Sequence, residues 1–342
     1  MQKPESEIKI LGFGSPLVDI LVNIGDSFLA ENVEGMKGGM ELVDISVIDN
    51  ILNKTPMEKS MVLGGSASNT IGALAKLGVK TGFLGKVGKD DMGEFFKKHF
   101  AGMGGDISRF KTNPDVRTGC CLSMVTPDSE RTMRTYLGAA LTITADEISD
   151  ADFQGYSHLH MEGYTLQYSP GVALKVFQCA KRNNLVVSLD MASFEVVKQF
   201  RNQLPELLKN YVDIVFCNED EAMQYTGTKN PEDIFNVLDG VCDVIALKLG
   251  KKGAVIKCGE LKVSVPALLV KAVDTTGAGD FWQAGFLYGY MPIKQLTGKL
   301  LEESGGFAAR LGAEVVQVMG ASIPGHKWTE IISDFRKIEN AR

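Results

Sequence analysis

Short apolar runs alternate with amphipathic stretches along most of the chain, and this alternation limits the possible folds more than any other feature of the sequence. Strand–helix alternation predicts a mainly parallel sheet covered by helices on both faces, a three-layer α/β/α fold. The expected strands are Ile8–Phe13, Thr81–Val87, His158–Met161, Val186–Leu189, Val212–Cys217 and Val244–Leu249. The expected helices are Ala67–Leu77, Asp91–Met103, Pro170–Arg182, Glu195–Lys209, Asp220–Tyr225, Glu232–Leu238, Gly279–Tyr290, Glu302–Met319 and Lys327–Ile338.

Two stretches interrupt this alternation. Residues 15–45 contain strand-like runs at Leu17–Ile24 and Met40–Val43, with no convincing helix between them. Residues 106–138 contain two more runs, Gly119–Val125 and Arg131–Leu137, around a Pro-Asp turn signal that is typical of a hairpin. We therefore predict one domain over residues 1–342, with a small β-sheet lid built from about 15–45 and 106–138. A further hairpin is expected from Gly253–Lys257 and Leu261–Val265.

Composition excludes several classes of protein. The chain has 342 residues, of which 44% are hydrophobic and 23% charged, as in ordinary globular proteins. Its net charge of −6 argues against a nucleic-acid-binding surface, which needs a basic stripe. No signal peptide and no apolar stretch of membrane-spanning length is visible. The six cysteines form no C-x-x-C pair and mostly lie in apolar runs, so we expect reduced thiols in a cytoplasmic protein with no membrane partner.

The segment Asp274–Asp280 contains Gly277-Ala278-Gly279 at the start of a predicted helix. Unpaired amides and the positive end of the helix dipole at such a turn suit phosphate oxygens. Asp280 places a carboxylate in the first turn, where it could accept a proton from a hydroxyl that attacks phosphorus. Taken alone, the same residues are equally consistent with a glycine turn followed by a helix-capping acid.

Two other segments contain glycine beside polar side chains. In Gly64–Thr70, the glycines allow close backbone approach to a ligand, and Asn69 is both a donor and an acceptor. Asp19 lies among apolar neighbours, where a carboxylate needs a partner. Together, a carboxylate and an amide side chain could grip a vicinal diol, although a helix start and a turn acid explain them singly. The sequence has no P-loop, and His158–Glu162 lacks a fourth ligand for a metal site.

In combination, these segments resemble the ribokinase-like (phosphofructokinase-B-type) carbohydrate kinase family. Asp274–Asp280 is similar to its D-T-x-G-A-G-D signature, and Gly64–Asn69 to its G-G-x-x-x-N element. Asn218-Glu219-Asp220-Glu221 resembles its N-x-x-E magnesium motif, and Leu249–Ala254 resembles its nucleotide-side loop. The order and spacing of the motifs match from about residue 8 to residue 325.

The resemblance implies a role for each matching residue. Asp280 would be the catalytic base, Gly277, Ala278 and Gly279 the anion hole, and Arg131 a clamp that closes over the phosphates. Asp19, Gly65 and Asn69 would hold sugar hydroxyls. The cofactors would be ATP, Mg²⁺ and, in some relatives, a monovalent cation such as K⁺. The ATP side would comprise Asn218, Glu221, Lys248, Gly250, Gly253 and Thr275, with Asn218 and Glu221 organising Mg²⁺ through water.

The substrate is harder to predict. Phe13–Asp19 and Glu130–Thr132 look most like the adenosine-kinase branch, and Leu17, Met40, Met133 and Phe194 could line a slot for a purine. Ser15 stands where adenosine kinases usually carry Asn. We therefore expect phosphorylation of a nucleoside's primary hydroxyl, with adenosine as the first choice. The alternatives are a sugar kinase of the same family and a noncatalytic nucleotide- or sugar-binding regulator, and the protein could be a monomer or a homodimer.

Overall fold

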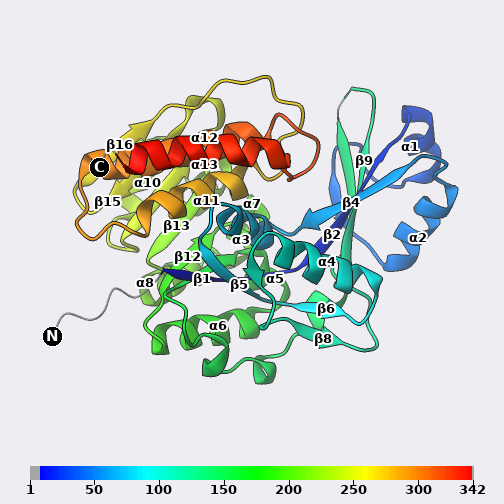
Figure 1. Ribbon diagram of the computed structural model, residues 1–342, viewed down its shortest axis with the longest axis horizontal. Helices are drawn as coiled ribbons and strands as arrows, with labels where there is room; N and C mark the ends of the chain where they lie inside the picture. Colours follow the sequence, from blue (N-terminus) through cyan, green and yellow to red (C-terminus); the bar gives the residue numbers. More distant parts are fainter. Residues whose placement is uncertain (1–7, 129, 341–342) are drawn as a thin grey trace.

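A mainly parallel sheet of nine strands runs through the centre of the computed structural model, which describes residues 8–128 and 130–340 (Figure 1). Its order is β16-β15-β14-β13-β12-β11-β1-β5-β7. Neighbouring strands from β14 to β7 are parallel, whereas β15 and β16 form an antiparallel hairpin at one edge. The strands are β1 (Lys9–Phe13), β5 (Lys80–Leu84), β7 (Gly105–Asp106), β11 (His158–Glu162), β12 (Val186–Asp190), β13 (Ile214–Asn218), β14 (Val244–Lys248), β15 (Ala254–Cys258) and β16 (Leu261–Val265).

Helices cover both faces of this sheet, because its strands are apolar on both sides. In β1, Ile10 packs into one hydrophobic core and Leu11 into the other. The first core contains residues of α3 (Ser66–Lys76), α4 (Asp91–Gly102), α11 (Ala278–Tyr290), α12 (Gly298–Val315) and α13 (Gly325–Glu339). The second contains residues of α5 (Tyr164–Tyr168), α6 (Pro170–Arg182), α7 (Phe194–Phe200), α8 (Leu204–Tyr211), α9 (Glu219–Thr226) and α10 (Pro231–Leu238). The predicted three-layer α/β/α fold is confirmed.

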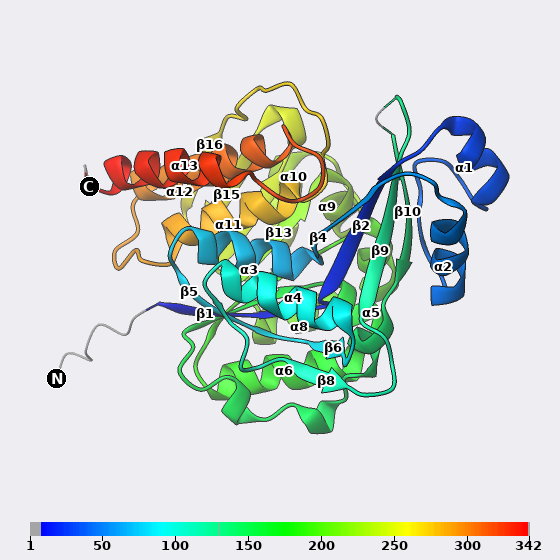
Figure 2. The same ribbon diagram turned by 45° about the vertical axis from the view of Figure 1, so that its right-hand side comes forward.

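A second sheet of five strands stands beside the large one (Figure 2). Its order is β3 (Met40–Leu42), β10 (Arg131–Tyr136), β9 (Gly119–Val125), β2 (Leu17–Asn23) and β4 (Lys59–Gly64). Alternate residues such as Ile20 and Leu122 pack against α1 (Asp26–Asn32) and α2 (Ile45–Lys54) in a third core. The opposite face carries Asp19 and Arg131 and is turned toward the large sheet.

The structure corrects several predicted boundaries. The helix α1 lies between β2 and β3, where no helix was expected; it is only seven residues long and buries Leu29 alone, so its apolar pattern is weak. The strand β4 belongs to the small sheet, although it falls outside both predicted segments. Within 106–138, only β9 and β10 belong to that sheet: β7 joins the large sheet, and β8 (Lys111–Asn113) pairs with β6 (Lys86–Gly88).

Two predicted elements are divided in the structure. The expected helix Glu195–Lys209 is two helices, α7 and α8, and Pro205 lies in the first turn of the second, a position that tolerates proline. The expected strand Thr81–Val87 is split between β5 and β6. In the part of the chain that the structure describes, no helix is both long and apolar enough to cross a membrane.

Candidate active site

Polar side chains gather at the carboxyl ends of four adjacent strands of the large sheet. Glu162 ends β11 and pairs with Asp190 at the end of β12, while Asn218 ends β13 and pairs with Lys248 at the end of β14. Open α/β sheets bind ligands at this edge because the parallel strands deliver their loops to one side. The site is therefore expected at this edge, below the small sheet.

Asp280 lies in the first turn of α11 and is held by α3. Its Oδ1 accepts a hydrogen bond from Ser66 Oγ (2.7 Å), and its Oδ2 accepts one from Asn69 Nδ2 (2.9 Å). Burial raises the pKa of Asp280 to about 6, although the bonds from Asn69 and Ser66 lower it. Asn69, predicted to hold a sugar hydroxyl, thus contacts the predicted base, and Ser66 is a second partner that the sequence analysis missed.

The glycine turn before α11 is where the sequence predicts the anion site. Gly277 has a φ of +74°, a left-handed conformation that favours glycine. The Ala278 amide donates to the Thr275 carbonyl oxygen (3.2 Å), so this amide is already engaged. A Cβ atom added to Gly279 would lie 3.2 Å from Lys248 Nζ, which places a cation directly beside the turn. The amides and the ammonium group together form a positive region at the start of α11.

Lys248 sits among buried carboxylates. Its Nζ donates to Asp190 Oδ1 (3.2 Å). Burial lowers the pKa of Lys248, but Asp190 and Glu221 raise it further, so the net pKa is above the usual range and the side chain is charged. Burial also raises the pKa of Glu221 to about 7, with Asp190 adding to the rise and Lys248 opposing it. The site therefore holds a buried cation, Lys248, whose positive charge is balanced by the carboxylates of Asp190 and Glu221.

Asn218 and Glu221 are paired with each other at the start of α9. Asn218 Oδ1 accepts from the amides of Asp220 and Glu221, while the Glu221 carboxylate accepts from the Asn218 amide (2.8 Å) and Nδ2 (2.6 Å). These are the bonds of a helix capping box. No group of three or more His, Cys, Asp or Glu residues suited to a metal occurs within 8–128 and 130–340. In this structure the pair caps α9, and its role in organising Mg²⁺ through water stays a prediction.

A cavity of about 540 Å³ extends from the start of α11 toward the β15–β16 hairpin. Ala278 and Gly279 lie at its polar end, and apolar residues such as Leu268, Trp282 and Val316 line the rest. The volume and lining are typical of a site for a small ligand. Five of the six residues predicted for the ATP side line this cavity: Asn218, Lys248, Gly250, Gly253 and Thr275; Glu221 is not among them.

The inner face of the small sheet carries four of the residues predicted for the substrate, Leu17, Asp19, Met133 and Met40. Leu17 and Asp19 project from β2 on this face, and strand register places Met133 of β10 directly beside Met40 of β3. Burial raises the pKa of Asp19 to about 7, while Arg131 lowers it. Met40 is 44% exposed, so it can contact a ligand without first leaving a core. Phe194 lies elsewhere, at the start of α7, and is exposed.

Glycines allow β4 to reach the site. A Cβ atom on Gly64 would collide with the Asp19 carboxylate, and one on Gly65 would collide with the Ser15 carbonyl oxygen. Gly65 also has a φ of +90°, which side chains rarely adopt. The predicted contact residue Gly65 thus lies where β4 turns into α3, close to the end of β1.

Arg131 joins the small sheet to the glycine turn. Its Nη1 contacts both Asp274 oxygens (2.8 and 3.0 Å) and Thr276 Oγ1, and its Nε donates to Ser123 Oγ (2.8 Å). Burial would raise the pKa of Asp274, but hydrogen bonds from the Thr276 and Gly320 amides and the charge of Arg131 hold it below its usual range. In this structure, Arg131 therefore contacts the turn that leads into the anion site.

Glu162 is a site residue that the sequence analysis did not identify. Its Oε1 accepts from the Ser15 amide (2.8 Å) and its Oε2 from the Ala67 amide (2.9 Å), so it joins the turn after β1 to the start of α3. Burial raises the pKa of Glu162 to about 7, against the lowering effect of those two bonds. The signal available in the sequence was the position of Glu162 at the end of an apolar strand, but the sequence analysis weighed Glu162 only as a metal ligand.

A buried carboxylate beside a glycine turn at a helix start can act as a base next to a phosphate, so this arrangement suits phosphoryl transfer to a hydroxyl group. The family described as pfkB family carbohydrate kinase matches residues 40–328, and the chain belongs to it. It is accordingly a kinase of the sugar and nucleoside class, in a family that uses ATP, generally with Mg²⁺.

Individual relatives point to both kinds of substrate. An uncharacterized sugar kinase from Archaeoglobus fulgidus is 29% identical over 252 residues, which is 72% of this chain and 96% of the relative. The adenosine kinase of Saccharomyces cerevisiae is 27% identical over 340 residues, 92% of this chain and 96% of the yeast protein. The crystal structure of adenosine kinase from Sinorhizobium meliloti matches with a TM-score of 0.83 and 29% identity, covering 97% of this chain and 99% of that one.

Proposed function

We propose that the protein transfers the γ-phosphoryl group of ATP to the primary hydroxyl of a nucleoside, most specifically adenosine. The observation that carries this proposal is the apolar character of the sheet face that bears Asp19. Leu17 lies two residues away on the same strand face. The Met133–Met40 pair lies on the same face two strands away, in the register row of Leu21. A purine needs a flat apolar slot beside the site for its ribose, whereas a bare sugar needs mainly donors and acceptors.

The proposed reaction uses groups already in place. Asp280 accepts the proton of the substrate hydroxyl as that oxygen bonds to the γ-phosphorus and the bond to the bridging oxygen of ADP breaks. Its pKa of about 6 keeps it largely ionised at neutral pH while remaining near the pH at which a base works best. Asp19 and Gly65 would hold the ribose hydroxyls, and Arg131 would cover the phosphates when the small sheet closes.

The nucleotide would occupy the cavity beyond Gly279. Lys248 and the amides of Gly277 and Gly279 would stabilise the charge on the transferring group, because they are fixed before the reaction begins. Bound Mg²⁺ would neutralise phosphate charge, and Asn218 and Glu221 would orient its water ligands. A monovalent cation such as K⁺ remains part of the proposal, with backbone carbonyl groups as its ligands.

A sugar kinase is the second candidate. Ser15 stands in place of the Asn usual in adenosine kinases. Its backbone amide donates a hydrogen bond to Glu162, and it has no amide side chain that could hydrogen-bond to a purine base. The relative from Archaeoglobus fulgidus, described as a sugar kinase, favours the same alternative. Ribose or fructose would then use Asp19 and Gly65 in the same way.

The test is ADP release with Mg²⁺-ATP and a panel of adenosine, inosine, guanosine, cytidine, ribose, fructose and 2-keto-3-deoxygluconate. We expect turnover with adenosine, and a loss of about 10²- to 10⁴-fold in Asp280→Asn. Calorimetry should show adenosine affinity within about threefold of the wild type in that variant. Turnover with sugars alone would replace the nucleoside proposal, and an active Asp280→Asn enzyme would remove the base assignment.

A further inference from the structure

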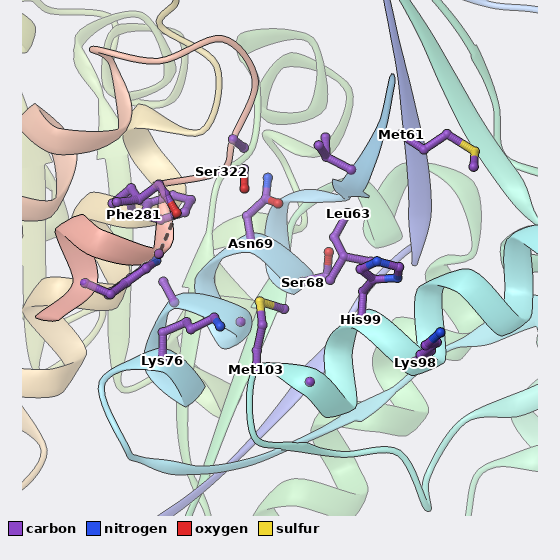
Figure 3. A pocket seen from close by; sticks show the side chains of 18 residues that line it. Met61, Leu63, Ser68, Asn69, Lys76, Lys98, His99, Met103, Phe281 and Ser322 are labelled. Atoms are coloured by element: carbon purple, nitrogen blue, oxygen red, sulfur yellow. Dashed lines mark hydrogen bonds between the residues drawn. The ribbon is translucent and has the colours of Figure 1, made fainter. Parts of the chain in front are cut away.

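A second cavity, of about 470 Å³, lies on the outer side of α3 (Figure 3). It is bounded by β4, α3, the end of α4 and the segment from residue 321 to residue 328. None of its lining residues lines the nucleotide cavity. It is therefore separate from the nucleotide cavity, and the proposed kinase reaction places neither ATP nor the substrate in it.

Much of the lining of this second cavity is apolar. Two aromatic side chains, Phe281 and Trp328, belong to it together with Leu63, Met103 and Ile323. Trp328 is held in place by a hydrogen bond from its Nε1 to the Ile323 carbonyl oxygen (3.2 Å). These residues suit the flat apolar body of a small organic molecule, and the volume is sufficient for one.

The charged lining is of one sign. Lys76, Lys98 and His99 border the cavity, and no Asp or Glu does, although the chain as a whole carries a net charge of −6. Within the described residues, neither Lys76 nor Lys98 has an ion pair or hydrogen bond, whereas the adjacent Lys97 pairs with Glu94 (2.5 Å). Unpaired lysines beside an apolar surface provide partners for an anion.

His99 also lines the second cavity. Its Nδ1 is hydrogen-bonded to the Phe95 carbonyl oxygen (2.8 Å), so Nδ1 carries the proton in the neutral ring and Nε2 is the nitrogen left for a ligand. In Figure 3, the ring extends toward the cavity beside Leu63, and Lys76 extends toward Met103. We propose that the second cavity binds a small aromatic anion, with its ring against Trp328 and Phe281 and its charged group near Lys76, Lys98 and His99.

The walls of the second cavity also touch the catalytic groups. Asn69 lines the cavity and donates to Asp280, and Phe281 follows Asp280 directly in α11. Ala321, another lining residue, has its Cβ only 2.7 Å from where a Cβ on Gly277 would lie. A molecule bound in the second cavity would thus contact residues that position the base and the glycine turn. We infer that binding of the anion changes turnover, and that any factor by which the anion changes the affinity for nucleotide is the factor by which nucleotide changes the affinity for the anion.

The binding test is calorimetric titration of the full chain with 1-naphthyl phosphate, with neutral 1-naphthol as the uncharged counterpart. We expect the double variant Lys76→Gln/Lys98→Gln to bind 1-naphthyl phosphate at least about tenfold more weakly and 1-naphthol within about twofold of the wild type. Lys97→Gln is the control for the change at Lys98, because it removes one positive charge from the same helix, α4, at a residue that does not border the cavity. Absence of binding, or equal losses in the control and the double variant, would overturn the proposal.

The coupling test is ADP release by the wild type at saturating 1-naphthyl phosphate. We expect turnover to change by more than about twofold in the wild type and to stay constant in the double variant. Binding that depends on the two lysines without any change in turnover would contradict the coupling. The titration itself needs no phosphoryl transfer, so its outcome is independent of which substrate the kinase uses.

Discussion

At the scale of single residues, four buried carboxyl groups define the chemistry of the site. Burial is the main reason that the pKa rises to about 7 in Asp19, Glu162 and Glu221 and to about 6 in Asp280. Without a ligand, the folded protein would be more stable with each of these carboxyl groups neutral, because burial penalises the charged form. Such groups gather where a protein gives up stability for function.

Asp19 provides a direct test of whether a buried carboxyl group at the site lowers stability in favour of function. Its pKa in the folded chain lies above its ordinary value of 3.8, so the folded protein loses stability as pH rises from about 4 to about 7, where the unfolded chain has released the proton and the folded chain still holds it. We expect Asp19→Asn to raise the free energy of unfolding at pH 8 by about 1 kcal/mol or more, with little gain at pH 4. The same variant should weaken substrate binding, because the diol loses a charged acceptor. Urea unfolding at both pH values and calorimetry measure the two effects.

The control for Asp19 is Asp128→Asn. Asp128 is exposed and bonded to Lys37, and the pKa of its carboxyl is held well below the ordinary range by that bond. Its removal should give no gain in stability at pH 8. Equal stabilisation by both substitutions would show that net charge, and not the burial of Asp19, controls the effect.

The raised pKa of Asp280 predicts how kcat/KM falls on the acid side of the pH profile, its acid limb. As pH falls through about 6, the carboxylate takes up a proton and can no longer act as base, so kcat/KM should fall about tenfold per pH unit below that point. Ser66→Ala removes a hydrogen bond that lowers the pKa, and it should move the limb to higher pH. Thr70→Val is the control, since Thr70 donates to the Asp280 carbonyl and not to its carboxylate. A limb that stays in place in Ser66→Ala would contradict this account.

At the scale of elements, Arg131 and Asp274 hold β10 to the turn before α11. Both side chains are almost fully buried, so removing one leaves the other charge without its partner. We expect Arg131→Ala to lower the free energy of unfolding by about 2 kcal/mol and to raise the KM for substrate. Chemical unfolding and ADP-release kinetics measure these changes.

A double-mutant cycle makes the Arg131 prediction specific. Arg131→Ala combined with Asp274→Asn should destabilise less than the sum of the single variants, because both remove one interaction. Arg117→Ala is the control: it breaks an exposed pair with Asp49 and should change stability by less than about 1 kcal/mol. Fully additive losses in the cycle would mean that the pair contributes nothing beyond packing.

Elements were predictable from the sequence where their pattern is strong. The buried strands and the long helices α3, α6 and α11 agree with their expected ranges within a few residues, because each combines regular apolar spacing with a clear turn signal. The helix α1 and the strand β4 were missed, since α1 buries Leu29 alone and β4 exposes half of its residues and has an apolar run of only three, Met61–Leu63. Registers and partners across the chain, such as Arg131 with Asp274, depend on tertiary packing that no local pattern encodes.

The candidate site was predictable to a similar degree. The motif residues Asp280, Gly279 and Lys248 do come together, because motifs at the ends of parallel strands meet at one edge. Ser66 and Glu162 were missed, since a serine and a strand-end glutamate are unremarkable until the fold places them beside Asp280 and the start of α3. Contacts of this kind join residues 95 to 214 positions apart.

At the scale of the whole molecule, the small sheet has its own core and can move as a unit. Its third core is distinct from the two that cover the large sheet, although Val18 of β2 packs in the first core and Met92 of α4 packs against both the first and the third. Two of the connections to the large sheet contain glycines with positive φ, Gly65 and Gly138, where the backbone is less restricted. Its inner face meets the rest of the site through Arg131 and Asp274, an interaction that a ligand can replace.

We therefore predict that substrate and nucleotide together close the small sheet over the site. Amide hydrogen exchange in 17–23 and 119–125 should slow by about tenfold or more when both ligands are bound, because closure excludes water from their inner face. The helix α6, which packs in the second core on the far face of the large sheet, should exchange at the same rate with and without ligands. Slowing in α6 and the small sheet alike would indicate general stabilisation, and unchanged exchange in both would show that the small sheet does not act as a lid.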